Sequence, residues 1–156
     1  MINDNRSYHL PIEIDLLFDN KKLDILKYLG ILYYANGNLK KRKLNIEQLL
    51  YYYSMLYFET SNTNAPMIYK YLRDEKRIHE IVIYLENLGF VEVHGDIFTR
   101  LNSLMISISE AGIEAIDSWQ SESIGVYLKQ ISNVMGKYTY GTKIFEFQNL
   151  LYEGEF

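Results

Sequence analysis

The segment from Asp74 to Gly112 constrains the fold of this chain more than any other. Its first part has apolar residues at helical spacings of three and four, and Gly89 follows where helices commonly end in left-handed backbone. These apolar residues are Ile78, Ile81, Val82, Leu85 and Leu88. A β-hairpin is predicted after Gly89, and Ser109 is placed to cap another helix. This order of helix, hairpin and helix is typical of the second half of a winged helix-turn-helix.

The strand register of the predicted hairpin has two alternatives. Gly95-Asp96 is a two-residue turn signal, so a meander would pair residues 90–94 with residues 97–101 and add a third strand over residues 104–109. The other alternative has only two strands, Phe90–His94 and Leu104–Ser109, with Gly95–Ser103 as the tip. Either arrangement gives a small wing.

Two helices with unusually apolar surfaces are predicted upstream, over Leu23–Ala35 and Ile46–Phe58. Asn45 precedes the second of them and Gln48 stands at its third position, which is the capping-box pattern. Both helices carry apolar side chains where a solvated helix would carry charges. They either pack on each other and on the C-terminal helices, or bind a protein partner through these extra faces. The residues predicted to contact a partner are Ile31, Tyr34, Tyr51, Tyr52, Met55 and Phe58.

The outward face of the candidate recognition helix is not typical of a DNA reader. Asn64 is predicted to cap a short helix over Met67–Arg73, and the recognition helix is predicted to follow from Asp74. The outward face of the recognition helix should present Lys76, Glu80, Ile83 and Asn87, with His79 and Tyr84 at its margins. Because phosphates repel a carboxylate at the centre of such a face, we expect this helix to be occluded or to face protein rather than to read DNA.

The charge of the chain weighs against an autonomous DNA-binding domain. The net charge is −4 and the isoelectric point is near 5.4, whereas DNA-binding domains are usually basic over at least one face. Should nucleic acid bind, the residues expected to contact it are Lys40, Lys41, Arg42, Lys43, Lys76, Arg77, His94 and Arg100.

The sequence carries no recognisable catalytic or metal-binding motif. His79-Glu80 begins like a zinc-protease motif, but Ile83 stands where the second histidine would be needed. With three histidines and no cysteine, a closed structural zinc site is not expected. We therefore expect no cofactor, no metal and no enzymatic activity.

Composition predicts a cytoplasmic protein. No apolar run reaches the roughly 18 residues of a membrane span, and the first residues, which include Asp4, Arg6 and Glu13, do not form a signal-peptide pattern. The absence of cysteine fits a reducing compartment.

A single mainly α domain with a small β-wing is the predicted fold class, a winged helix-turn-helix with additional N- and C-terminal helices. Its expected parts are an N-terminal arm and helix (residues 1–43), the winged-helix core (44–120), and C-terminal helices with an acidic aromatic tail (121–156). Helices are expected over Glu110–Gln120 and Glu122–Lys137, and residues 11–19 are expected to form an edge strand or an irregular arm.

Two stretches resemble MarR-type winged-helix regulators. They are Leu85-Glu86-Asn87-Leu88-Gly89-Phe90-Val91-Glu92-Val93 and Met105-Ile106-Ser107-Ile108-Ser109-Glu110-Ala111-Gly112. The match covers about a quarter of the chain and implies the recognition-helix and wing region of that fold. The chain departs from the family at Glu80 and Ile83, on the face that would read DNA.

The overall layout resembles the middle component of bacterial ABC three-component systems, the Lamassu-type defence assemblies. The similar parts are Leu23-Asp24-Ile25-Leu26-Lys27-Tyr28-Leu29, Leu49-Leu50-Tyr51-Tyr52-Tyr53 and the wing. This resemblance implies a non-enzymatic accessory subunit that binds an SMC-like ATPase and helps to couple DNA sensing to an effector nuclease, with nucleic acid inside the complex as a further partner. The alternative function is a MarR-like DNA-binding transcriptional regulator, a homodimer through its outer helices.

Overall fold

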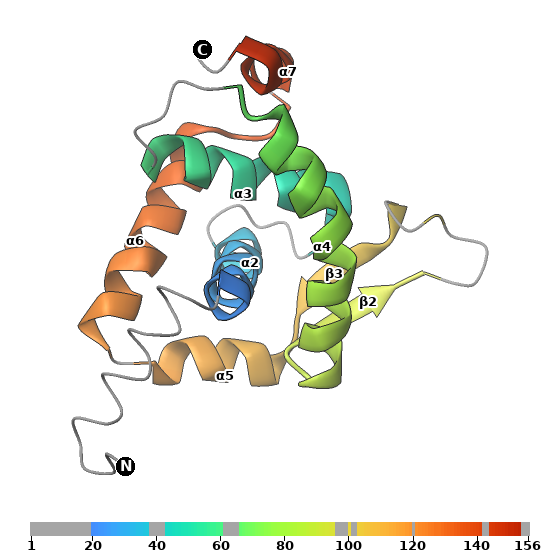
Figure 1. The fold of residues 1–156 in the computed structure, drawn as a ribbon. Helices are drawn as coiled ribbons and strands as arrows, with labels where there is room; N and C mark the ends of the chain where they lie inside the picture. Colours follow the sequence, from blue (N-terminus) through green and yellow to red (C-terminus); the bar gives the residue numbers. More distant parts are fainter. Residues whose placement is uncertain are drawn as a thin grey trace, which may run out of the picture.

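The computed structural model describes residues 20–37, 43–60, 66–95, 100, 103–119, 121–141 and 144–153 (Figure 1). It is mainly helical, with a three-stranded antiparallel sheet. The elements are α2 (Asn20–Gly37), β1 (Leu44–Asn45), α3 (Ile46–Thr60), α4 (Ile68–Asn87), β2 (Val91–His94), β3 (Met105–Ile108), α5 (Glu110–Ser118), α6 (Glu122–Lys137) and α7 (Ile144–Glu153). The predicted edge strand or arm over residues 11–19 lies outside the described residues.

Helix α2 is the central element of the fold. It is surrounded by α3, α4, α5 and α6, and the wing projects beyond α4 on one side (Figure 1). This position explains why α2 is apolar on nearly all sides, because a helix packed from every direction has no solvated face to mark with charges. Gly30 lies against α6: a Cβ atom at this position would stand 2.8 Å from Ile131 Cδ1.

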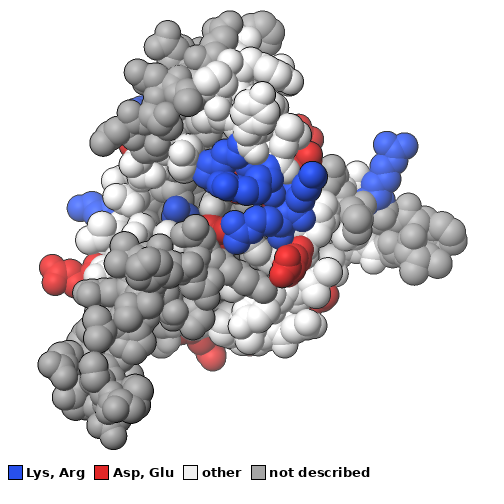
Figure 2. Space-filling model, viewed as in Figure 1, with Lys and Arg blue, Asp and Glu red and all other residues white. Residues whose placement is uncertain are grey.

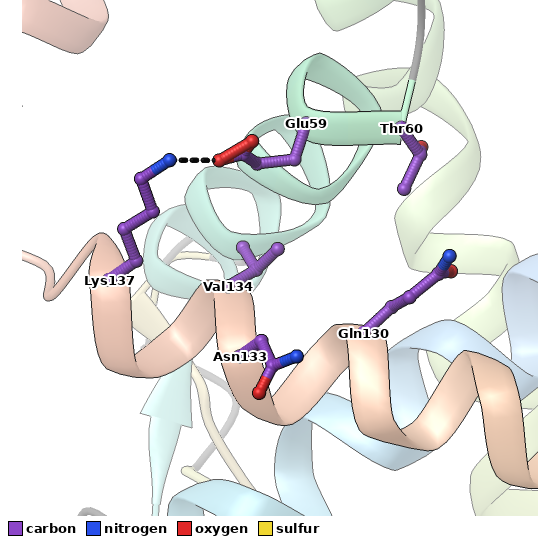
Figure 3. Close-up of a pocket in the computed structure, with 6 residues that line it drawn as sticks. All are labelled: Glu59, Thr60, Gln130, Asn133, Val134 and Lys137. Carbon is purple, nitrogen blue, oxygen red and sulfur yellow. Dashed lines mark hydrogen bonds and ion pairs between the residues drawn. The ribbon is translucent and has the colours of Figure 1, made fainter.

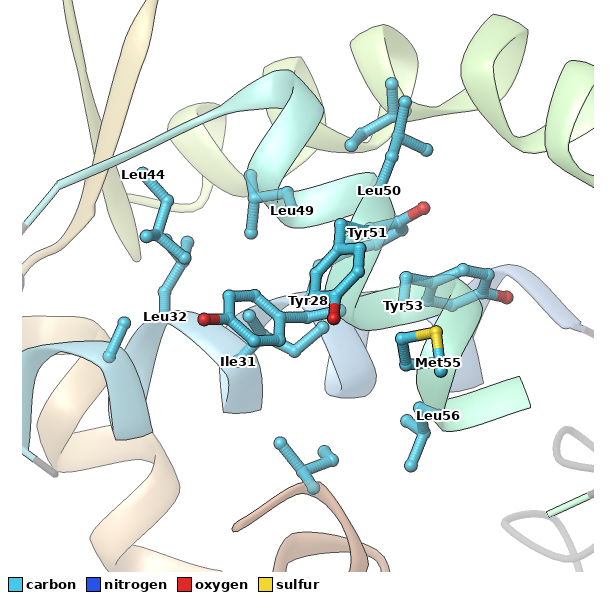
Figure 4. Close-up of a cluster of buried hydrophobic side chains, with 14 of the residues drawn as sticks. Tyr28, Ile31, Leu32, Leu44, Leu49, Leu50, Tyr51, Tyr53, Met55 and Leu56 are labelled. Atoms are coloured by element: carbon cyan, nitrogen blue, oxygen red, sulfur yellow. The ribbon is translucent and has the colours of Figure 1, made fainter. Parts of the chain in front are cut away.

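Helix α3 is covered on its second side by the C-terminal part of the chain. All residues from Leu49 to Leu56 are buried (Figure 4). The Tyr51 ring packs edge-on against Phe147 of α7, with 5.0 Å between centroids. The Tyr52 hydroxyl accepts a 3.1 Å hydrogen bond from the backbone N–H of Tyr140.

This packing corrects the prediction of a partner-binding surface on α2 and α3. Ile31, Tyr51, Tyr52 and Met55 are at most 2% exposed, so they cannot contact another protein while the fold is intact. The extra apolar faces instead pack against each other and against α6 and α7, which was the alternative interpretation. Tyr34 and Phe58 are half-buried at the edge of this core.

The sheet has the strand order β1-β3-β2. Val91 pairs with Ile108 and His94 with Met105, which is the pairing expected for the two-stranded alternative; residues 96–99, 101 and 102, in its predicted tip, lie outside the described residues. The short strand β1, which was not predicted, joins the other edge of β3 by pairing Leu44 with Ile106.

The predicted helix caps of α3 and α5 are confirmed. The Gln48 N–H donates to Asn45 Oδ1 at 2.8 Å and the Asn45 N–H donates to Gln48 Oε1 at 3.0 Å, which completes the capping box. Ser109 Oγ accepts from the Gly112 N–H at 3.1 Å. Together these bonds satisfy backbone donors that a helix leaves without a partner in its first turn.

The predicted end of α4 at Gly89 is also confirmed. Gly89 has φ +80°, the left-handed conformation that favours glycine. Its N–H donates to the Glu86 carbonyl at 2.9 Å, and the Phe90 N–H reaches back to the Leu85 carbonyl at 3.0 Å. This pair of bonds is a Schellman motif, which satisfies the last carbonyls of the helix.

Two expectations about helices differ from the structure. Residues 68–87 form one continuous helix, without the predicted break before Asp74, which is buried and paired with Lys70 at 2.5 Å. Leu88 lies just after the helix and is 46% exposed instead of facing the core. The aromatic tail forms α7, with Phe147, Leu150 and Leu151 buried; α5 and α6 lie where helices were predicted.

Candidate partner-binding and anion-binding surfaces

Most of the large hydrophobic side chains that are exposed among the described residues lie on α4 or directly after it. Seven large hydrophobic side chains are exposed among the described residues. Five of the seven belong to α4 or to Leu88, the residue after it. These five are Tyr69 (82% exposed), Leu72 (45%), Ile83 (57%), Tyr84 (42%) and Leu88 (46%). The expected outward positions Lys76, Glu80, Ile83 and Asn87 are all exposed, as predicted.

A small apolar cavity lies between α4 and the wing. It has a volume of about 160 Å³ and is lined by Ile46, His79, Val82, Ile83, Glu86, Val93, Leu104 and Ile106. His79 Nε2 is buried and has no hydrogen-bond partner among the described residues. On the wing itself, His94 Nε2 lies 2.8 Å from Ser107 Oγ, so His94 is held within the sheet.

A basic pocket lies between the first turns of α2 and the first half of α4. It has a volume of about 190 Å³, and Figure 2 shows Lys and Arg side chains gathered over this part of the surface. We define the basic pocket by its lining residues, which are Leu23, Asp24, Lys27, Tyr53, Tyr57, Lys70, Arg73, Asp74 and Arg77.

Two buried carboxylates hold two of the four cations of the basic pocket. Asp24 is 5% exposed, pairs with Arg77 at 3.1 Å and accepts a hydrogen bond from the Tyr53 hydroxyl. Asp74 is 4% exposed and pairs with Lys70 at 2.5 Å. The two carboxylates thereby fix the head groups of Arg77 and Lys70 at the rim of the pocket.

Burial shifts the pKa of three groups that line the basic pocket: Lys27, Asp74 and Tyr53. It lowers the pKa of the Lys27 ammonium, since the charged form loses its hydration, and Asp24 opposes this shift. Burial also raises the pKa of the Asp74 carboxyl, with the hydrogen bond from Lys70 acting in the opposite direction. The pKa of Tyr53 is raised because the ring is buried and its hydroxyl faces Asp24.

A third pocket lies between α3 and α6. Its charged side chains pair with each other and hold the two helices together. Glu59 pairs with Lys137 at 2.5 Å (Figure 3). It also accepts a 2.8 Å hydrogen bond from the Tyr138 hydroxyl. The hydrogen bond from Lys137 lowers the pKa of Glu59. The other lining residues are Thr60, Gln130, Asn133 and Val134, and none of them adds a charge.

The described residues that were predicted to contact nucleic acid are spread over several elements. Lys43, Lys76 and Arg100 are exposed but lie on different elements, while Lys40, Lys41 and Arg42 lie outside the described residues. Arg77 faces the basic pocket instead. Sequence reasoning missed Lys27, Lys70 and Arg73, although the spacing of residues 70, 73, 74 and 77 places them on one side of a helix.

Other kinds of site are not found in the described ranges. No group of three or more metal-ligating side chains occurs among those residues. Nor does any described helix combine the length and apolarity needed to cross a bilayer. No protein-family model, no curated protein and no solved structure matches the chain.

Proposed function

We propose that this chain is a non-enzymatic accessory subunit with a winged-helix fold, which binds a protein partner through the outer face of α4. The order of its elements supports this fold: a helix, a short strand, two helices, and a two-stranded wing. The strand order β1-β3-β2 also supports a winged-helix fold, because β1 adds a third strand to the two strands of the wing. Helices α3 and α4 would then be the helix-turn-helix pair, with α4 in the position of the recognition helix.

The exposed apolar face of α4 is the observation that carries this proposal. In a DNA reader this helix presents hydrogen-bond donors to the major groove, but here Ile83 and Glu80 are at the centre of the face. Clustered exposed apolar side chains typically mark a protein contact, and tyrosines such as Tyr69 are common in such contacts.

The resemblance to the three-component defence systems supplies the class of partner. The proposed partner is the SMC-like ATPase of an anti-phage or anti-plasmid complex, with an effector nuclease as the third component. The partner contact proposed here lies on α4 and replaces the buried positions on α2 and α3 that were first predicted.

A matched pair of substitutions tests the proposed surface. Ile83 on α4 and Val126 on α6 are 57% and 54% exposed, so Ile83→Glu and Val126→Glu place the same charge at equally accessible helical positions. After nuclease treatment of the lysate, the wild-type chain and Val126→Glu should co-purify with the ATPase, and Ile83→Glu should not. Circular dichroism should show that all three are folded. Equal recovery of the ATPase by a folded Ile83→Glu variant would refute the proposed surface.

A MarR-like DNA-binding regulator is the second candidate function. The exposed cations Lys76 on α4 and Arg100 near the wing favour it, since these elements enter the grooves in winged-helix complexes. Replacing either cation with glutamine should then weaken duplex binding and reduce the slope of log affinity against log salt by about 1 per cation. A slope that stays the same in both variants argues against this function.

A further inference from the structure

The basic pocket combines an excess of positive charge with buried side chains that hold part of it in place. Four cations line the pocket (Lys27, Lys70, Arg73 and Arg77) against two carboxylates (Asp24 and Asp74). Both carboxylates are more than nine-tenths buried, so the cations around them stand over a low-dielectric interior where charge interactions are strengthened. The pocket therefore has two positive charges more than its own acids neutralise.

The positions of two of these cations are fixed before any ligand arrives. Arg77 is held by Asp24, and Lys70 by Asp74. The Lys70 ammonium also lies over the rings of Tyr53 and Tyr57, at 4.5 and 4.6 Å from their centroids. These cation–π contacts help to keep the Lys70 ammonium in place, and an aromatic ring does not neutralise its charge.

The other two cations, Lys27 and Arg73, form no ion pair with another described residue, although Asp24 lies near Lys27 and Asp74 near Arg73. Lys27 is half-buried, and burying an ammonium without a paired anion is unfavourable. An anion in the pocket would relieve this cost and would reach Lys27 from α2 and Arg73 from α4 together.

We propose that the basic pocket binds a phosphate group, held between Lys27 and Arg73 with Lys70 and Arg77 at its rim. A phosphate monoester carries about −1.5 to −2 charges at pH 7, which matches the excess of the pocket. The planar guanidinium of Arg73 suits two phosphate oxygens at once. The phosphate can come from a small phosphorylated molecule or from a nucleic-acid backbone, since both present the same group. This site shares α4 with the proposed partner face, but none of the five exposed apolar residues of that face lines the pocket.

The full chain can be titrated with inorganic phosphate and pyrophosphate by calorimetry, with sodium chloride added to keep the ionic strength constant. We expect saturable binding and a rise in melting temperature that chloride alone does not produce. Arg73→Gln should weaken binding by about tenfold or more, because it removes charge-assisted hydrogen bonds. Lys129→Gln, which removes an exposed charge from α6, should leave binding unchanged.

A second titration, with a fluorescent DNA duplex, identifies the source of the phosphate. Duplex binding that Arg73→Gln weakens, and that pyrophosphate displaces, supports a backbone phosphate as the ligand. Binding of pyrophosphate without duplex binding supports a small phosphorylated molecule. The proposal is overturned if neither probe binds above the ionic-strength control, or if a folded Arg73→Gln variant binds both probes as tightly as the wild type. Ile83→Glu should leave phosphate binding intact, so failure of this proposal is distinguishable from failure of the proposed partner face.

Discussion

Gly112→Ala should destabilise the protein, although alanine is the better helix former. Gly112 lies in the first turn of α5, where the helix begins against the base of the wing. A Cβ atom there would stand 2.3 Å from the Phe90 carbonyl oxygen and 2.7 Å from Ile108 Cγ1. The oxygen belongs to the backbone and accepts a hydrogen bond from the Ser109 N–H, so it cannot rotate away. The helix start or the wing must therefore move.

The size of the effect follows from two opposing contributions. Overpacking of this kind costs about 3 kcal/mol, the upper part of the usual range, because backbone blocks the added methyl group. Replacing glycine with alanine in a helix returns about 1 kcal/mol. The net loss should be about 2 kcal/mol, which lowers the melting temperature of a domain of this size by roughly 4–8 °C.

Gly125→Ala is the matched control for this substitution. Gly125 lies near the start of α6, is exposed, and has nothing within 4 Å of the position of an added Cβ atom. The same change there should stabilise the protein by about 0.5–1 kcal/mol. Urea unfolding of the two variants and the wild type measures both effects. If Gly112→Ala is as stable as Gly125→Ala, the close approach of α5 to the wing is wrong.

Other perturbations test the caps and the basic pocket. Asn45→Ala should lower the free energy of unfolding by about 1 kcal/mol, and a double-mutant cycle with Gln48→Ala should show coupling between the two side chains. Gly89→Ala should cost about 1 kcal/mol because of the positive φ, and Gly89→Asn should cost less in the same urea titration. Burial raises the pKa of Asp74 above its ordinary value of 3.8, so the folded state holds this proton more tightly than the unfolded chain. As pH rises from about 4 through the folded pKa, the wild type should lose stability relative to Asp74→Asn; a difference that stays constant with pH contradicts this.

Features that depend on neighbouring residues could be predicted from the sequence. The capping box joins Asn45 to Gln48, and the Ser109 cap reaches Gly112, so each pair lies within one turn of helix. Gly89 could be predicted because left-handed backbone is a property of a single residue. The outward face of α4 followed from helical periodicity alone, since that face needs no knowledge of the rest of the fold.

Features that depend on distant segments could not be predicted in the same way. An apolar face looks the same in sequence whether a partner or another part of the chain covers it, so Tyr51 was assigned to an interface although Phe147 covers it. The basic pocket was missed for a related reason. Asp24 and Arg77 meet only because α2 and α4 pack side by side, and nothing near either residue in the sequence indicates the other.

The central position of α2 has a consequence for the order of folding. Among the described helices α2 is the first to be synthesised, yet its Gly30 packs against Ile131, on a helix made much later. Until α6 emerges, one side of a strongly apolar helix lacks its cover, and exposed surface of that kind promotes aggregation. Contacts that join such distant parts of a chain also slow folding. The side of α2 that α6 covers therefore stays exposed for most of the synthesis of the chain. In a chain that stops before α6, this side of α2 would remain exposed.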